Sequence, residues 1–179
     1  MRSRVALSGH QQRLSGLPAV ILVAATAAVA QAFGRFTFGV LLPAIRDDLG
    51  LSNTLAGSLG TANVAAYLLG TLAVAALSNH LPLLAVMRIG MVLAVGGLAL
   101  AAVAPTAPVL AVGLFLAGAG GALTWIPAPV VAAGALAPER RPLAIGILAS
   151  GMGMGVVFTG QLAGYVRGSL GDANWRLVY

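Results

Sequence analysis

Five long apolar runs constrain what this chain can fold into. Each has about the 20 residues that a helix needs to cross the hydrocarbon core of a bilayer, and short polar segments separate them. Backbone N–H and C=O groups inside a bilayer must bond within the segment, which favours helices. We expect spans at about 17–42, 55–77, 83–104, 109–136 and 143–166.

The composition excludes an ordinary soluble domain. Hydrophobic residues make up 59% of the chain and charged residues 8%, whereas a soluble domain carries about 25% charged residues. Because so few charges cannot cover a globule in water, the lipid bilayer is the expected partner. The sequence predicts an all-α integral membrane protein with five transmembrane helices and the start of a sixth. Residues 17–179 would form one transmembrane domain and residues 1–16 a cytoplasmic segment.

The first apolar run could also be a secretory signal peptide. Arg2, Arg4 and Arg13 precede it, and Val29-Ala30 has small residues like those of a cleavage site. However, the run continues to Leu42, which is too long for a signal core. We therefore interpret it as an uncleaved first membrane helix.

The arginines indicate an orientation. The chain has a net charge of +6 and its basic residues are all arginines. If neighbouring spans are antiparallel, one side holds Arg2, Arg4, Arg13, Arg88, Arg140 and Arg141, and the other holds Arg46, Arg167 and Arg176. This bias predicts a cytoplasmic N-terminus. The arginines sit in the gaps between spans rather than in an aromatic-flanked patch, so no nucleic-acid partner is expected.

Arg35 is the most informative single residue, because it lies inside the first run. A charge near the bilayer centre costs at least about 2.5–3.5 kcal/mol, so it normally faces a cavity or a partner. Gln31 lies one turn earlier on the same helix face. Arg35 could line a transport path and meet an anionic solute. It could equally reach the interface, or bond carbonyls that hold helices together.

Four further side chains could line a cavity or join helices. Asn63 and Tyr67 are one turn apart in the second run, and Gln161 lies in the fifth. Trp125 precedes Pro127 and Pro129, which should kink the fourth run because proline lacks a backbone donor. A bent helix at mid-membrane often borders a substrate cavity, but Trp125 could also be a packing residue.

Two glycine pairs in the fifth run have the spacing of helix contacts. Gly151 and Gly155 form one pair, and Gly160 and Gly164 form the other. Small residues let helix backbones approach closely in lipid, where hydrophobic contact alone gains little. The pairs predict helix packing, although membrane helices are also rich in glycine for no specific reason.

The residues needed for catalysis are missing. The chain has no cysteine, its two histidines are isolated in connections, and its four carboxylates also lie in connections. It has no HExxH motif, and a nucleotide-binding GxxxxGK[ST] motif cannot occur without lysine. We expect no enzyme activity, no cofactor and no metal.

One stretch carries a family resemblance. Residues 34–52 read GRFTFGVLLPAIRDDLGLS, with a proline before an acidic pair and a Leu-Gly-Leu-Ser turn. Ala56-Gly57, residues 67–70, the Pro-Glu-Arg-Arg connection and Trp175-Arg176 follow in fitting order. The sequence thereby resembles the N-terminal part of major facilitator superfamily (MFS) transporters, in particular the bacterial YbfB/YjiJ-like branch.

The resemblance implies transport of a small solute by alternating access, in a bacterial plasma (inner) membrane. Members are implied to have twelve helices in two halves, with the solute between them. We therefore expect a truncated or partial permease that needs its C-terminal half or a partner chain. The alternative is a non-transporting membrane remnant or a helical scaffold that binds other membrane proteins.

The chain departs from the family pattern at several positions. The connection 75–84 lacks the usual acid and basic cluster, and Leu114 stands where an arginine is common. The Gly-Pro motif of drug/proton antiporters is absent, since 151–155 carries methionines between its glycines. The pattern therefore does not favour drug/proton antiport.

Overall fold

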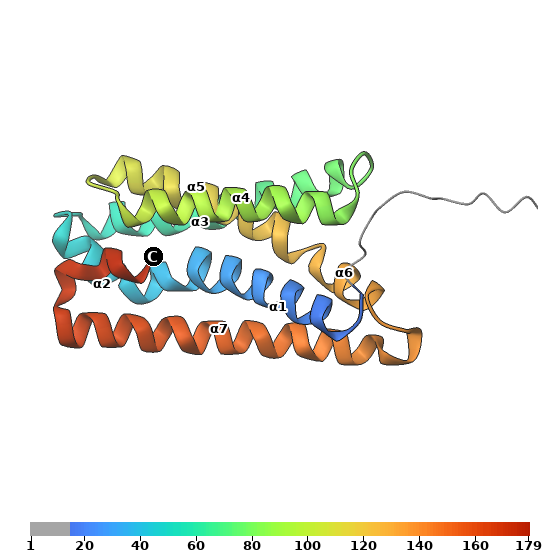
Figure 1. Ribbon diagram of the computed structural model, residues 1–179. Coiled ribbons are helices and arrows are strands. Elements are labelled where there is room, and N and C mark those ends of the chain that lie inside the picture. The colour runs from blue at the N-terminus through green and yellow to red at the C-terminus, as the bar shows by residue number, and fades with distance from the viewer. Residues whose placement is uncertain (1–14) are drawn as a thin grey trace, which may run out of the picture.

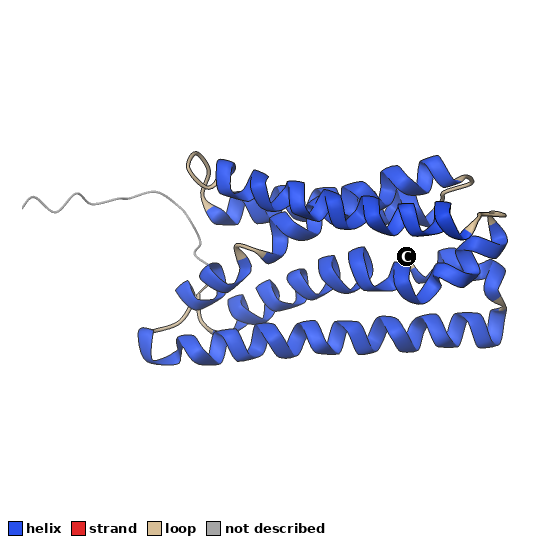
Figure 2. Cartoon of the chain, turned by 180° about the vertical axis from the view of Figure 1, so that it is seen from behind, coloured by secondary structure: helices blue, strands red, loops and turns tan. Residues whose placement is uncertain are grey.

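The computed structural model describes residues 15–179, and throughout this range the regular structure is helical, with no strand (Figure 2). Residues 1–14 lie outside the described residues. The prediction that Arg2, Arg4 and Arg13 set the orientation therefore stays a prediction, and so does most of the expected segment 1–16.

Five helical segments are long and apolar enough to cross a membrane, as the sequence predicted. The first span joins α1 (Leu17–Gln31), the π-helical η1 (Ala32–Phe36) and α2 (Thr37–Asp48), and the second and third are α3 (Asn53–Leu77) and α4 (Leu83–Ala102). The fourth consists of α5 (Ala107–Trp125) and α6 (Ala128–Gly134), and the fifth of η2 (Pro138–Arg140) and α7 (Arg141–Leu170). A short 3₁₀ helix, η3 (Asp172–Val178), follows.

The helices form two layers (Figure 1). In one layer α5 packs between α3 and α4, and in the other α1 packs along α7. The fourth span passes from the first layer to the second, where α6 packs on α7. The connections alternate between two ends of the bundle. We call them the Gly16 end, which holds connections 78–82 and 135–140, and the η3 end, which holds 49–52 and 103–106.

The first helix does not end before Pro43, as its sequence suggested, but continues to Asp48. Pro43 removes the bond to the Gly39 carbonyl, and its ring lies on the exposed side of the helix. The residues after it are tightly packed, with Ala44 1% and Ile45 0% exposed. This burial holds the last turn in helical form despite the missing bond.

The kink expected in the fourth span is present as a break between α5 and α6. Trp125 ends α5, and Pro127 precedes the first residue of α6. Pro127 lacks the N–H that would continue the α5 ladder, so the chain changes direction there.

Glycines allow the layer of α3, α4 and α5 to form. A Cβ atom built on Gly97 would lie 2.5 Å from the Gly113 carbonyl oxygen, and one on Gly90 would lie 2.8 Å from the Gly120 oxygen. On α3, a Cβ on Gly70 would lie 2.8 Å from the Ala119 oxygen. Any side chain at these positions would push the backbones apart, so close contact replaces hydrophobic burial as the source of association.

The two glycine pairs of α7 lie in different surroundings. A Cβ on Gly151 would lie 3.3 Å from the Ala24 methyl group, and one on Gly155 would lie 3.2 Å from the Ala32 methyl group. Gly160 and Gly164 have no neighbour within 4 Å of such a Cβ among the described residues. The structure thus places the first pair at the contact with the first span, and the second pair on an open face.

Polar contacts join the helix termini at the η3 end. The Asp48 carboxylate accepts hydrogen bonds from Trp175 Nε1 at 3.0 Å and from Arg176 at 2.7 Å. Arg176 also donates to the Ala104 carbonyl oxygen at 2.8 Å. The first span, the α4–α5 connection and η3 are therefore linked through one guanidinium group. Nearby, a hydrogen bond from Arg167 lowers the pKa of the Asp172 carboxyl.

The contact between α4 and α5 can be tested with adjacent glycines. We expect Gly97→Val to destabilise the bundle by about 1–3 kcal/mol or more, because the added side chain overpacks the contact. The matched control is Gly96→Val, since a Cβ at Gly96 has no neighbour within 4 Å. Thermal unfolding in detergent measures both. Equal melting temperatures for the two variants would contradict the packing described.

Candidate functional site

The first span changes its helical geometry where Arg35 lies. Residues Ala32–Phe36 form a π-helical turn, in which each backbone bond spans one residue more than in an α-helix. The Ala32 carbonyl oxygen accepts both the backbone N–H of Thr37 and, at 3.0 Å, the Thr37 hydroxyl group. Such turns occur often at functional sites, because they re-aim side chains and free carbonyl groups.

Asn63 connects this turn to two other helices. Its side-chain amide nitrogen, on α3, donates to the Gly34 carbonyl oxygen at 3.0 Å and to the Leu114 carbonyl oxygen of α5 at 2.6 Å. Asn63 is 2% exposed, so both bonds are shielded from competing polar groups. Gly118 leaves the space for Asn63, because a Cβ there would collide with the Asn63 backbone. Of the two roles expected for Asn63, the contacts are those of a helix-joining residue.

Arg35, Gln31 and Tyr67 come together beside Asn63. The Arg35 guanidinium lies over the Tyr67 ring at 4.5 Å from its centroid, a cation–π geometry. Gln31 Nε2 donates to the Tyr67 hydroxyl oxygen at 3.4 Å. Gln31 is 2% exposed, whereas Arg35 and Tyr67 are half-buried. The ring therefore holds the guanidinium from one side and leaves its other side open.

The Arg35 charge is not neutralised by the described residues: within 15–179 it makes no ion pair and no hydrogen bond. Three of the four carboxylates pair with other arginines at the η3 end, and Glu139 lies at the Gly16 end. A cation held inside a membrane span without an anion favours an anionic ligand.

A groove of about 360 Å³ runs from Arg35 between the first span and α3. Its walls are apolar apart from Arg35 and Asn63, and the lining residues used below are Phe36, Gly39, Leu42, Gly57, Gly60 and Val64. A Cβ on Gly39 or Gly57 would meet no other atom of residues 15–179 within 4 Å, so these two glycines leave the groove open. A volume of this size is at the lower end for small-molecule sites.

The other two predicted cavity residues lie elsewhere. Trp125 is half-buried and packs on a cluster that includes Val20, Met87 and Leu148, toward the Gly16 end. Gln161 is exposed on α7. The structure therefore groups Gln31, Arg35, Asn63 and Tyr67 and separates them from Trp125 and Gln161.

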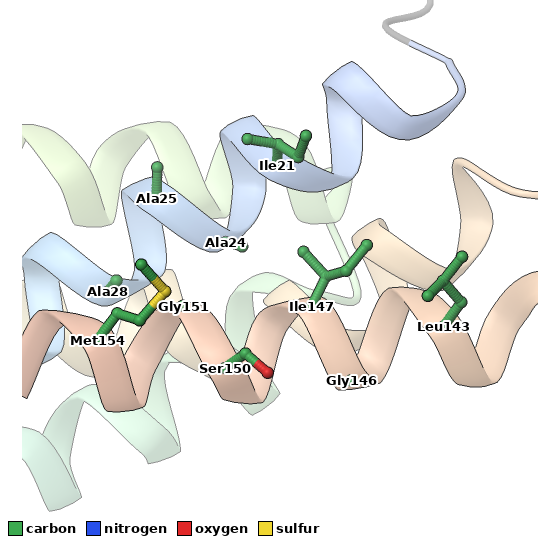
Figure 3. A pocket seen from close by; sticks show the side chains of 10 residues that line it. All are labelled: Ile21, Ala24, Ala25, Ala28, Leu143, Gly146, Ile147, Ser150, Gly151 and Met154. Carbon is green, nitrogen blue, oxygen red and sulfur yellow. The ribbon is translucent and has the colours of Figure 1, made fainter.

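A second groove, of about 520 Å³, lies between α1 and α7 (Figure 3). Its lining is apolar apart from the Ser150 hydroxyl group, with Ile21 and Ile147 among the larger side chains. None of the described residues that line it carries a charge that could orient a ligand. Within the part of the chain that the structure describes, no three histidine, aspartate or glutamate side chains gather as a metal site would require.

Sequence reasoning missed the groove. Arg35, Gly39 and Leu42 share one helical face, as do Gly57, Gly60 and Val64 on α3. The sequence shows this spacing. It does not show how α3 packs against the first span, and only that packing brings the two faces together.

The role of Asn63 can be tested by truncation. We expect Asn63→Ala to lose about 1–3 kcal/mol of stability, since two buried bonds between membrane helices disappear and each contributes about 0.6–1.7 kcal/mol. The control is Asn79→Ala, which removes an exposed bond within one helix end. Detergent unfolding and the accessibility of a cysteine placed at Gly39 measure the effect. Unchanged stability and accessibility would show that Asn63 does not hold the turn.

The chain matches a known protein family over most of its length. The model of the family described as Major Facilitator Superfamily matches residues 24–179, which include Gln31, Arg35, Asn63 and Tyr67. None of the curated proteins matches the sequence.

Proposed function

Since this chain belongs to the Major Facilitator Superfamily and is a transporter of that type, we propose that it moves a small anionic solute across its membrane by alternating access. Arg35 would contact the anionic group. The observation that carries the proposal is the unpaired guanidinium of Arg35, which is half-buried within the first span.

The surroundings of Arg35 support a binding role over a purely structural one. The hydrogen bonds that join the helices at this level come from Asn63 instead. Gln31 and Tyr67 position the guanidinium, and its donors remain available. A planar guanidinium offers paired N–H groups that match a carboxylate or phosphate group.

We further propose that a second helical half covers the face that carries Arg35, either a C-terminal half or a partner chain. The unpaired charge of the half-buried Arg35 supports this, because a cation that faces lipid costs free energy. A solute held between two halves would be released when they rock apart. Rigid-body rocking around a fixed site near the bilayer midplane is how secondary transporters achieve alternating access.

The distribution of exposed arginines supports one orientation of the chain. We propose that the Gly16 end faces the cytoplasm of a bacterium and that the chain lies in the inner membrane, within the YbfB/YjiJ-like branch. Exposed Arg88, Arg140 and Arg141 lie at that end in support. At the η3 end, Arg46, Arg167 and Arg176 each pair with a carboxylate, which reduces its net positive charge.

The role of Arg35 is tested by uptake into vesicles of radiolabelled acetate, benzoate and inorganic phosphate. We expect Arg35→Ala to lower kcat/KM for the transported anion at least about thirtyfold, since removing one partner of a buried charge pair costs about 2–5 kcal/mol. Arg35→Lys should recover part of the rate, because it keeps the charge but not the paired donors.

The control for Arg35 is Arg46→Ala, because Arg46 forms a surface pair with Asp47 away from the groove. Unchanged uptake in both Arg35 variants would remove Arg35 from the transport path. No uptake of these anions by the wild-type protein together with its second half or partner chain would favour the helical scaffold instead.

Orientation can be measured directly because the sequence contains no cysteine. We expect single cysteines at Ser78 and Ala137 to be protected from a membrane-impermeant maleimide added outside intact cells. Cysteines at Ser52 and Thr106 should be labelled, since they lie at the opposite end of the bundle. The reverse pattern would overturn the cytoplasmic placement of the Gly16 end.

A further inference from the structure

The groove beside Arg35 combines one positive charge with a long apolar wall. Among the described residues that line it, only Arg35 is charged, and most of the others are aliphatic, aromatic or glycine. The amide nitrogen of Asn63 also borders the groove, but it already donates to the carbonyl oxygens of Gly34 and Leu114. The groove therefore offers one binding site for a negative charge and a long apolar surface on which the described residues have no free group to hydrogen-bond a polar ligand.

From this arrangement we infer that the transported solute is an amphiphilic monocarboxylate, with its carboxylate at Arg35 and an apolar tail along the groove toward Leu42. This inference rests on the proposed function and names the solute class. A sugar or a dicarboxylate would bury polar groups against apolar walls without bonds, which costs free energy. A simple inorganic anion would leave the groove unused.

The length of the groove sets the length of the tail. Arg35 and Leu42 are seven residues apart on one helix face, which corresponds to about 10 Å. Gly39 lies between them on the first span, and Gly57 and Gly60 lie opposite on α3. A Cβ on Gly60 would lie 3.2 Å from the Phe38 ring, so this glycine has a packing role, whereas Gly39 and Gly57 face open space.

The depth of Arg35 favours a free solute over a phospholipid. Along the first span, Arg35 is about 27 Å from Leu17 and about 20 Å from Asp48. The hydrocarbon core is about 30 Å thick, so phospholipid headgroups stay about 15 Å from its centre. A phospholipid would have to draw its headgroup deep into the bilayer to reach Arg35, whereas a small carboxylate can enter whole.

Binding to the purified protein in neutral-lipid nanodiscs tests the inference. The probes are acetate, butanoate, hexanoate and octanoate, with octanamide as the uncharged analogue of octanoate. We expect affinity to rise about fourfold per methylene while the tail stays within the groove, which corresponds to about 0.8 kcal/mol for each buried CH₂. Octanamide should bind much more weakly. Protein-free nanodiscs correct for partition into lipid.

Glycine variants separate the groove from the anion contact. Gly57→Leu and Gly39→Leu would fill the groove, so we expect them to abolish the gain in affinity with chain length. Gly96→Leu is the matched control, because Gly96 faces open space on α4, away from the groove. Arg35→Gln should weaken acetate and octanoate alike. Circular dichroism and melting temperature establish that each variant is folded.

The outcomes distinguish this inference from the proposed function. If acetate binding depends on Arg35 but affinity does not rise with chain length, the solute is not an amphiphile, and the proposal that the protein transports an anion is retained. The inference of an amphiphilic solute is also overturned if affinity depends on chain length equally in Gly57→Leu and Gly96→Leu. If no carboxylate binding depends on Arg35, both fail. If anionic phosphatidylglycerol in the nanodisc displaces octanoate at Arg35, the occupant is a lipid and the inference is overturned.

If the leucine variants fail to fold, binding of the carboxylate series to the wild-type protein still tests the inference. An increment per methylene that does not exceed partition into protein-free nanodiscs would overturn the inference. A larger increment together with weak octanamide binding would support it.

Discussion

The two hydrogen bonds from the Asn63 amide determine how the middle of this bundle is arranged. They reach the carbonyl oxygens of Gly34 and Leu114, so one side chain on α3 joins the first span and α5. Gly34 lies in the π-helical turn at Ala32–Phe36, where the first span departs from the regular α-helical pattern, and Leu114 lies within α5. In a hydrocarbon surrounding few other polar groups compete for these carbonyl oxygens, which makes the contact specific.

The site depends on this contact. Because the turn is held against α3, Arg35 lies over the Tyr67 ring and beside the groove, instead of extending toward the membrane surface. The same side chain that joins the helices therefore exposes a cation to a hollow between them. Structural bonds and the unpaired charge are divided between neighbouring residues, with two hydrogen bonds from the Asn63 amide and no ion pair at Arg35 among the described residues.

Glycine has two opposite uses in this molecule, and only their surroundings distinguish them. At Gly97 and Gly70 the missing side chain lets two backbones touch, so α3, α4 and α5 form one tight layer. At Gly39 and Gly57 the missing side chain leaves space that a ligand can enter. The tight layer gives a rigid wall, and the groove lies where the first span meets that wall. A transporter needs both, because a cavity keeps its shape only when the helices around it are packed.

The sequence by itself determined that the chain is helical and membrane-embedded, roughly where its five spans lie, and that Arg35 is exceptional. Those conclusions rest on hydrophobicity, length and the cost of a charge in lipid, which are local properties. Only the tertiary structure decided that the first helix passes through Pro43, because the burial of Ala44 and Ile45 compensates for a lost bond. It also decided that Gly151 packs closely while Gly160 does not, and that Arg35 and Gly57 border one groove. Each of these depends on which helix faces meet, and helix packing involves residues too far apart in the chain for spacing alone to specify.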